Sequence, residues 1–188
     1  MSSILKVDTL QDSGGNAIIS SNGSGTFTSS LPNTGITEAD MWRITAHYAY
    51  SGNQSYVDLT ANWERVDTDG FGKIGNGMSE SSGIFSFPST GIYLILNNYS
   101  FNTAAGGSPF HGLITRVTTD NSAYSYATEN YVMISSNYNN GSSSFIFDVT
   151  NTSTHKVKFT YYVNGATNLR GNTAVNQTHF TFIRLGDT

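Results

Sequence analysis

Residues 83–93 read Gly83-Ile84-Phe85-Ser86-Phe87-Pro88-Ser89-Thr90-Gly91-Ile92-Tyr93, and this stretch holds the local signals that decide the fold. Phe85 and Phe87 are two residues apart, which predicts a short strand with one buried face. Pro88 has no backbone N–H to donate, so it is expected to end that strand. Gly91 would then allow the chain to turn back tightly into the next strand. The stretch therefore predicts a short core strand, a proline turn and the start of a long central strand.

An alternation with a period of two continues over most of the chain after residue 38. Apolar side chains at every second position predict strands with one buried face in the segments 42–50, 91–101, 113–117, 145–149, 157–163 and 180–185. Clusters of Gly, Asn, Asp and Ser separate these segments as turns. No segment has a convincing helical pattern. We therefore expect an all-β protein with eight to ten strands in an antiparallel sandwich, which a jelly roll would close.

Composition and charge argue against two classes of partner. Charged residues make up 12% of the chain, and the net charge of -4 comes from scattered positions. Without a basic stripe to neutralise successive phosphates, a nucleic-acid partner is not expected. The longest apolar run, 92–96, is too short to span a bilayer, and the first residues lack a signal-peptide pattern. The absence of Cys excludes disulfide bonds and thiolate metal sites.

Residues 1–36 differ from the rest of the chain, and we expect them to form an extended attachment arm beside a head domain at 37–188. The polar segments 12–16 and 20–25 are typical of turns or flexible linkers. A flexible tail would explain these segments. It would not explain the aliphatic side chains between them, which favour burial against another surface. The expected anchoring residues are Ile4, Leu5, Val7, Leu10, Ile18 and Ile19.

Candidate catalytic and metal-binding residues form no recognisable constellation. No histidine has a partner at metal-ligand spacing; the four are His47, His111, His155 and His179. The turn 67–70 resembles the start of a calcium loop, but Met78 stands where such a loop has its bidentate Glu. We expect no metal, no cofactor and no enzymatic activity. The alternative is a glycosidase whose acids come from distant strands, with Glu64, Glu80 and Glu129 as candidates.

Four tyrosines gather in a region rich in Ser and Asn: Tyr124, Tyr126, Tyr131 and Tyr138. Their rings would suit stacking against a sugar, because an aromatic ring offers an apolar face and the phenol adds a polar tip. Packing inside a subunit interface would explain the same rings equally well. The sequence leaves both interpretations open.

Residues 83–93 resemble the signature Gly-x-Phe-x-x-Pro-x-x-Gly-x-Tyr of the complement globular head and tumour-necrosis-factor superfamily, with every fixed position present. The closing segment 180–185 is also similar to that family's last strand, although Thr181 replaces the usual Gly. The resemblance extends over about residues 38–187, and over 102–150 it rests on the strand pattern alone. It implies a ten-strand jelly roll that forms a homotrimer through apolar faces near a threefold axis.

The long strand predicted after Gly91 is the expected subunit contact, because it is apolar on both faces and one chain rarely buries both. One face carries the expected interface residues, Tyr93, Ile95, Tyr99 and Phe101. The other face carries Ile92, Leu94 and Leu96.

Residues 5–16 are similar to segments that begin virion proteins of phages with marine and cyanobacterial hosts. Together with the jelly-roll signature, this implies a virion protein on the outer surface of a capsid or tail. The leading hypothesis is a trimeric capsid decoration (cement) protein whose arm binds the major capsid protein or another virion protein. The alternative is a tail-fibre or head-fibre tip that binds host glycans. A carbohydrate-active enzyme is the third class.

Overall fold

The computed structural model describes residues 7–29, 35–51, 55–68, 70–103, 110–133 and 137–188. Contacts within the chain divide it into two compact units, Met1–Gly35 and Ile36–Thr188. We call them the N-terminal unit and the head. The described residues contain strands, turns and bends but no helix, and hence no helix that could cross a membrane.

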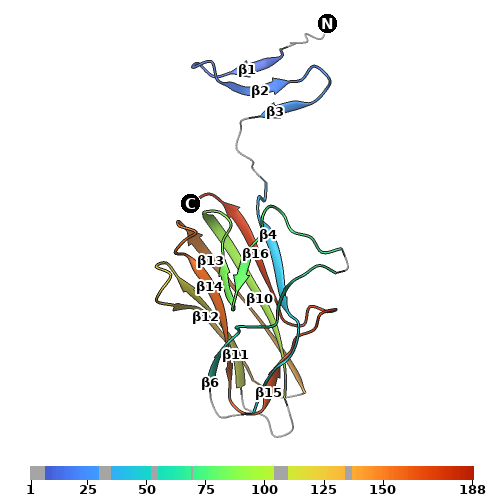
Figure 1. The fold of residues 1–188 in the computed structure, drawn as a ribbon, viewed down its shortest axis with the longest axis vertical. Coiled ribbons are helices and arrows are strands. Elements are labelled where there is room, and N and C mark those ends of the chain that lie inside the picture. Colours follow the sequence, from blue (N-terminus) through green and yellow to red (C-terminus); the bar gives the residue numbers. More distant parts are fainter. Residues whose placement is uncertain (1–6, 30–34, 52–54, 69, 104–109, 134–136) are drawn as a thin grey trace. The chain divides into compact units, whose positions relative to one another are not determined.

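The N-terminal unit contains a three-stranded antiparallel sheet in the order β1-β2-β3 (Figure 1). Its strands are β1 (Thr9–Gln11), β2 (Ala17–Ser21) and β3 (Phe27–Ser29). The sequence predicted an extended arm, whereas the polar segments turn the chain back on itself. In the first turn the Asp12 carboxylate accepts hydrogen bonds from the backbone N–H groups of Gly14 and Asn16, at 2.8 and 2.9 Å. Such a side-chain cap stabilises a turn in place of an extended chain.

The head is a two-sheet antiparallel sandwich of thirteen described strands, β4 to β16. There are more strands than the expected eight to ten because short strands also form at 55–58, 79–81 and 167–169, where no strand was predicted, and because the predicted strand 42–50 is divided into two. Sheet I has the order β5 (Tyr48–Tyr50), β15 (Thr167–Leu169), β10 (Gly91–Thr103), β16 (His179–Gly186), β4 (Ala39–Ile44), β7 (Trp63–Arg65), and β13 (Tyr138–Val149) also pairs with β10. Sheet II has the order β12 (Ser125–Met133), β11 (Phe110–Thr118), β14 (Lys156–Val163), β9 (Ile84–Ser86), β8 (Ser79–Ser81), and β6 (Ser55–Asp58) also pairs with β14.

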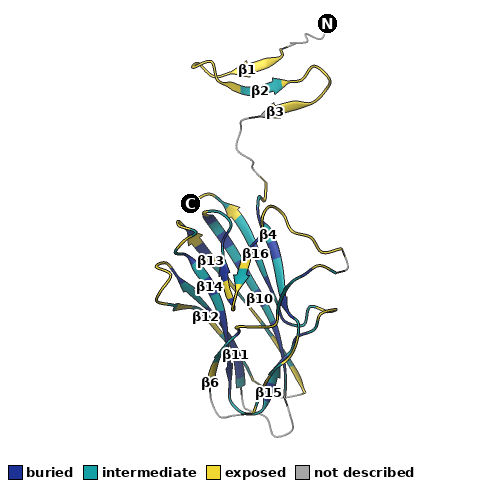
Figure 2. Ribbon diagram, viewed as in Figure 1, coloured by how far each residue is buried: buried dark blue, intermediate teal, exposed yellow. Residues whose placement is uncertain are grey.

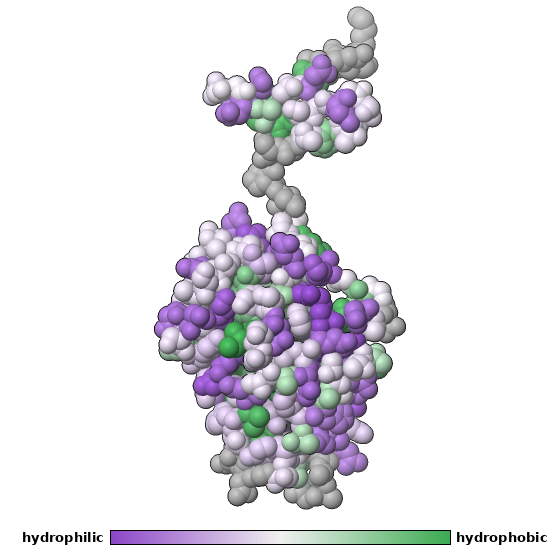
Figure 3. All heavy atoms as spheres, viewed as in Figure 1, coloured by the Kyte–Doolittle hydropathy of each residue, from purple (hydrophilic) through white to green (hydrophobic). Residues whose placement is uncertain are grey.

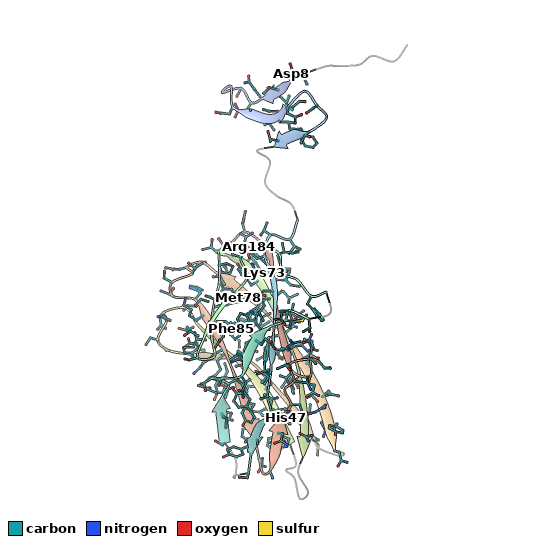
Figure 4. The ribbon with its side chains drawn as sticks, turned by 45° about the vertical axis from the view of Figure 1, so that its right-hand side comes forward. Asp8, His47, Lys73, Met78, Phe85 and Arg184 are labelled. Atoms are coloured by element: carbon teal, nitrogen blue, oxygen red, sulfur yellow. The ribbon has the colours of Figure 1, made fainter. Side chains whose placement is uncertain are left out.

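The hydrophobic core lies between the two sheets, where buried residues line the facing strands (Figure 2). Phe85 on β9 is fully buried there, and Figure 4 shows it in the interior near Met78. Its ring lies 4.8 Å from the ring of Trp63 and 5.2 Å from that of Phe182, measured between centroids. Both partners belong to sheet I, so Phe85 joins the two layers.

The glycine that follows the proline turn is required by a close approach. Gly91 has φ 144°, and a Cβ at this position would lie 2.5 Å from the carbonyl oxygen of Gly186. A larger residue would therefore push β10 away from β16 at the start of their pairing.

Buried carboxylates hold the loop before β8 against sheet I. Asp40 accepts hydrogen bonds from the backbone N–H of Met78 and the Nε1–H of Trp42, both at 2.8 Å, and pairs with Arg65 at 3.0 Å. Glu38 accepts one from the backbone N–H of Gly77 at 2.9 Å. These bonds satisfy charges that would be costly to bury alone.

We expect Phe85→Ala to lower the free energy of unfolding by about 3–5 kcal/mol, because it removes a fully buried ring and leaves a cavity between the sheets. Ile84→Ala, one residue earlier on the same strand, should cost less than about 1 kcal/mol, because Ile84 is partly exposed. Urea unfolding of both variants measures the difference. Equal costs would show that Phe85 does not carry the packing between the layers.

Candidate functional site

The four residues expected at a subunit interface lie in the hydrophobic core of a single chain. Tyr93, Ile95, Tyr99 and Phe101 are each at most 1% exposed. These four side chains lie on the face of β10 that points toward sheet II, and sheet II covers that face. A side chain buried inside its own chain cannot contact a neighbouring subunit, so this assignment is corrected: the four are core residues.

The opposite face of β10 forms an apolar surface on the outside of sheet I. Leu94 pairs with Ile146 on β13 and with Ile183 on β16, so the three side chains form one row. Leu94 and Ile183 are half-buried, and Ile146 is 60% exposed. We call this surface, together with its neighbours, the sheet I face; it comprises Met41, Ile92, Leu94, Leu96, Ile146 and Ile183.

The sequence interpretation missed Ile146 as a surface residue. The sequence did contain a signal for this position: Ile146 lies between Phe145 and Phe147, whose alternation predicts the buried face of one strand. Both phenylalanines pack into or against the core, so Ile146 must point outward.

The N-terminal unit exposes an apolar face of its own. Leu10 pairs with Ile19, and Phe27 pairs with Ser21 two residues further along β2, so Leu10, Ile19 and Phe27 share one face. Leu10 is 52% exposed and Phe27 is 66% exposed. None of residues 7–28 is buried, as the yellow and teal strands of Figure 2 show. A sheet that buries none of its residues gains little from the hydrophobic effect, so this face favours a partner.

The other expected anchoring residues are placed differently. Val7 is 58% exposed beside β1, and Ile18 is half-buried on the face opposite Ile19. Ile4 and Leu5 lie outside the described residues.

The candidate acids each have a structural partner. Glu64 accepts a hydrogen bond from the Nε–H of the buried Arg43 at 2.8 Å, and Glu80 accepts one from the backbone N–H of Gly83 at 2.6 Å. Glu129 lies 3.4 Å from the hydroxyl of Tyr131. In the turn that resembles the start of a calcium loop, Asp67 also pairs with Arg43, and Asp69 lies outside the described residues. Among described residues, no three His, Asp or Glu side chains are grouped to hold a metal ion.

His111 is a buried ionisable group with an unusual environment. It is 0% exposed, and its ring lies 5.2 Å from that of Phe101 in the core. Among the described residues, neither ring nitrogen has a hydrogen-bond partner. Burial lowers the pKa of His111 to about 4, because the apolar surroundings disfavour the imidazolium. The histidine is therefore neutral at physiological pH.

The structure divides the tyrosine cluster between the two sheets. Tyr126 and Tyr131 lie on β12 of sheet II, and Tyr124 precedes that strand with its ring under Lys158. Tyr138 lies on β13 of sheet I, beneath Arg170. Three further rings join the sheet II group and were missed from sequence, Tyr56, Phe110 and Tyr162. Their strands are distant in the chain, and only strand pairing brings them together.

The chain matches no family model and no curated protein. Its structure is similar to murine APRIL, with a TM-score of 0.56 and 15% identity over 79% of this chain and 98% of that one. It is similar to Eiger TNF from S. frugiperda, with a TM-score of 0.57 and 10% identity over 82% and 96%. It is also similar to the vertex protein P5 of PRD1, with a TM-score of 0.50 and 15% identity over 81% and 99%.

These similarities confirm the fold that the signature predicted. The head is an all-β, antiparallel jelly roll of the tumour-necrosis-factor type, and the vertex protein P5 of PRD1 shares that architecture.

We expect the stability of the protein to fall between pH 7 and pH 5 because of His111. The unfolded chain takes up a proton near pH 6.5, whereas the folded chain resists protonation down to about pH 4. The contribution of the neutral His111 to the free energy of unfolding is therefore fully present above pH 7, and it declines as the pH falls below the pKa of the unfolded chain. His111→Leu should reduce the decrease in Tm between pH 7.5 and pH 5.

Burial also lowers the pKa of His179. In the His111→Leu variant the decrease in Tm should therefore become smaller but should not disappear. If His111→Leu and the unmodified protein show the same decrease in Tm between pH 7.5 and pH 5, His111 is not the group that titrates.

Proposed function

We propose that this chain is a non-enzymatic structural protein of a bacteriophage virion, a homotrimer on the outer surface that acts as a capsid decoration (cement) protein. The N-terminal unit attaches it to the shell. The observation that carries the proposal is the apolar face of that unit, where Leu10 and Phe27 are each more than half exposed and no described residue is buried. A sheet of this kind is suited to packing against another protein surface.

A trimer would carry three N-terminal units, or arms, and attachment through all three would compensate for weak binding of any one of them to the shell. Each arm offers a few aliphatic and aromatic side chains, worth roughly 1.5–3 kcal/mol each when fully buried, and ordering the arm opposes this gain. In a trimer the second and third arms bind at a high effective concentration once the first is bound. Avidity can then raise retention by orders of magnitude. The major capsid protein or another virion protein is the proposed partner.

The sheet I face is the proposed contact between subunits. Its central row of Ile146, Leu94 and Ile183 crosses three paired strands, so it presents a continuous apolar surface. Contiguous surfaces of this kind on soluble proteins commonly mark association sites. Closed symmetry then limits the assembly to a defined oligomer, and the resemblance to a trimeric superfamily favours three copies.

Two observations favour a virion location. Residues 5–16 are similar to the beginnings of phage virion proteins, and the fold occurs in a vertex protein of PRD1. The alternative is a fibre tip that binds host glycans. Copy number separates the two: hundreds of copies per particle would favour decoration, and a few tens would favour a fibre.

We expect the full chain to have three times its 20.3 kDa mass in light scattering, and Leu94→Glu with Ile146→Glu to reduce this to the monomer mass. The introduced charges would be buried without partners in the sheet I face. Ile84→Glu on sheet II is the matched control and should remain trimeric. A monomeric unmodified protein, or a double variant that stays trimeric, would refute the proposed interface.

We expect a protein starting at Ile36 to keep the Tm of the full chain within about 3 °C and to lose binding to virions, because the contacts that stabilise the head lie within residues 36–188. Cosedimentation with virions of the encoding phage measures binding. Leu10→Asp with Phe27→Asp should have the same effect in the full chain. Thr28→Asp, which adds charge to the opposite face of the same sheet, should bind normally. Wild-type occupancy by the truncated protein would contradict the attachment role.

A further inference from the structure

A row of aromatic side chains crosses the outer face of sheet II. Tyr56 on β6 pairs with Tyr162 on β14, Tyr162 pairs with Gly112 on β11, and Gly112 pairs with Tyr131 on β12. Side chains of directly opposed residues point to the same face. Tyr161, the neighbour of Tyr162, points into the core, which places this row on the outside.

These rings are packed into one layer. Tyr162 is 6% exposed, and the rings of Tyr56, Phe110 and Tyr131 lie 4.9, 5.3 and 5.5 Å from it. Above this base, Tyr56 and Tyr131 remain 51% and 39% exposed. Tyr126 adds a third ring, 6.3 Å from that of Tyr56 and 49% exposed. We call Tyr56, Tyr126 and Tyr131 the tyrosine face.

Gly112 fixes the position of Tyr131. A Cβ at residue 112 would lie 2.3 Å from Cδ1 of Tyr131, so the ring rests against the bare backbone of β11. From this position it meets the rings of Phe110 and Tyr162 edge-on, each at 88°. Tyr131 is thus held before any ligand arrives, which lowers the entropic cost of binding.

Charged side chains border the tyrosine face, and their charges balance. Asp58 pairs with Lys158 at 2.7 Å and with Arg116 at 3.7 Å, and Arg116 lies 4.7 Å above the ring of Tyr126. Glu129 lies beside Tyr131. Next to this border is an open hollow of about 140 Å³, lined in part by Asp58, Lys158 and Ser82. The border therefore combines donors and acceptors with two positive and two negative charges.

Exposed rings beside a balanced set of polar groups fit one ligand chemistry best. A pyranose has an apolar C–H face that stacks on an aromatic ring, and its hydroxyls both donate and accept hydrogen bonds. A nucleic acid would need cations free to meet its phosphates, whereas Asp58 already pairs with both cations and the net charge is -4. An aliphatic partner would not need the charged border.

We infer that the tyrosine face is a binding site for a neutral hexopyranose saccharide. Tyr56, Tyr126 and Tyr131 stack against the sugar rings, and Asp58, Arg116 and Lys158 hydrogen-bond the hydroxyls. Attachment to a shell requires no such site, so the inference goes beyond the proposed function. It is also compatible with it, because sheet II lies on the opposite side of the sandwich from the sheet I face. On the side drawn in Figure 3 the surface of the head is mostly hydrophilic, with small separate hydrophobic spots.

The test is binding of the full chain to an array of neutral hexopyranose oligosaccharides that includes cellohexaose, maltohexaose and mannohexaose. The best-bound member is then titrated by calorimetry. We expect Tyr126→Ser and Tyr56→Ser each to weaken binding by about tenfold or more, and Tyr126→Phe to retain it, because stacking needs the ring and not the hydroxyl. Gly112→Ala should also weaken binding, since it displaces Tyr131.

Tyr138→Ser is the matched control, because Tyr138 is similarly exposed at 58% but lies on sheet I. It should bind like the unmodified protein. Circular dichroism and Tm identify any variant that has unfolded, and the remaining tyrosine variants then decide. Three results would overturn the inference: no binding to any neutral oligosaccharide on the array, binding that survives both serine variants, or preferential binding of single-stranded DNA. Capture of a purified virion protein through the same tyrosines, without saccharide binding, would instead assign the face to a protein contact.

Discussion

The packing of Phe85 between the two sheets is the contact on which the head depends. Phe85 belongs to sheet II, and its nearest rings, Trp42, Trp63 and Phe182, belong to sheet I. A three-residue strand contributes few ladder hydrogen bonds, so its position is set mainly by this ring. After this strand, Pro88 ends the ladder and Gly91 lets β10 begin against β16. β10 also pairs with β13 and β15, so it lies at the centre of sheet I.

Much of the fold could be predicted from the sequence, because alternation reports directly on strands with one buried face. It could not show which face of β10 is internal. Tyr93 and Ile95 alternate with Ile92 and Leu94, and both sets are apolar. Sheet II covers the first set, whereas the second set is half-buried on the outer face of sheet I, and tertiary packing determines this difference. The arm shows a similar limit: its turns were visible in the sequence, but the pairing of Leu10 with Ile19 was not.

The functional surfaces depend on contacts between distant parts of the chain, which local patterns do not report. Glu64 was a candidate acid until its bond to Arg43, 21 residues away, gave it a structural role. The tyrosine face draws rings from β6 and β12, so only part of it lay in the Ser- and Asn-rich region. Buried charges such as Asp40 follow the same rule, since their partners come from separate strands and loops.

The position of β16 also governs when the head can form. In sheet I this strand lies between β10 and β4, and its partner in β4 is about 140 residues earlier in the chain. During synthesis, one edge of β4 and the part of β10 at residues 92–98 therefore lack their partner until β16 has been made, although β4 can already pair with β7 on its other edge. An unpaired apolar strand edge readily joins that of another chain. The head can thus close only after β16 has been made, and its yield depends on keeping incomplete chains apart.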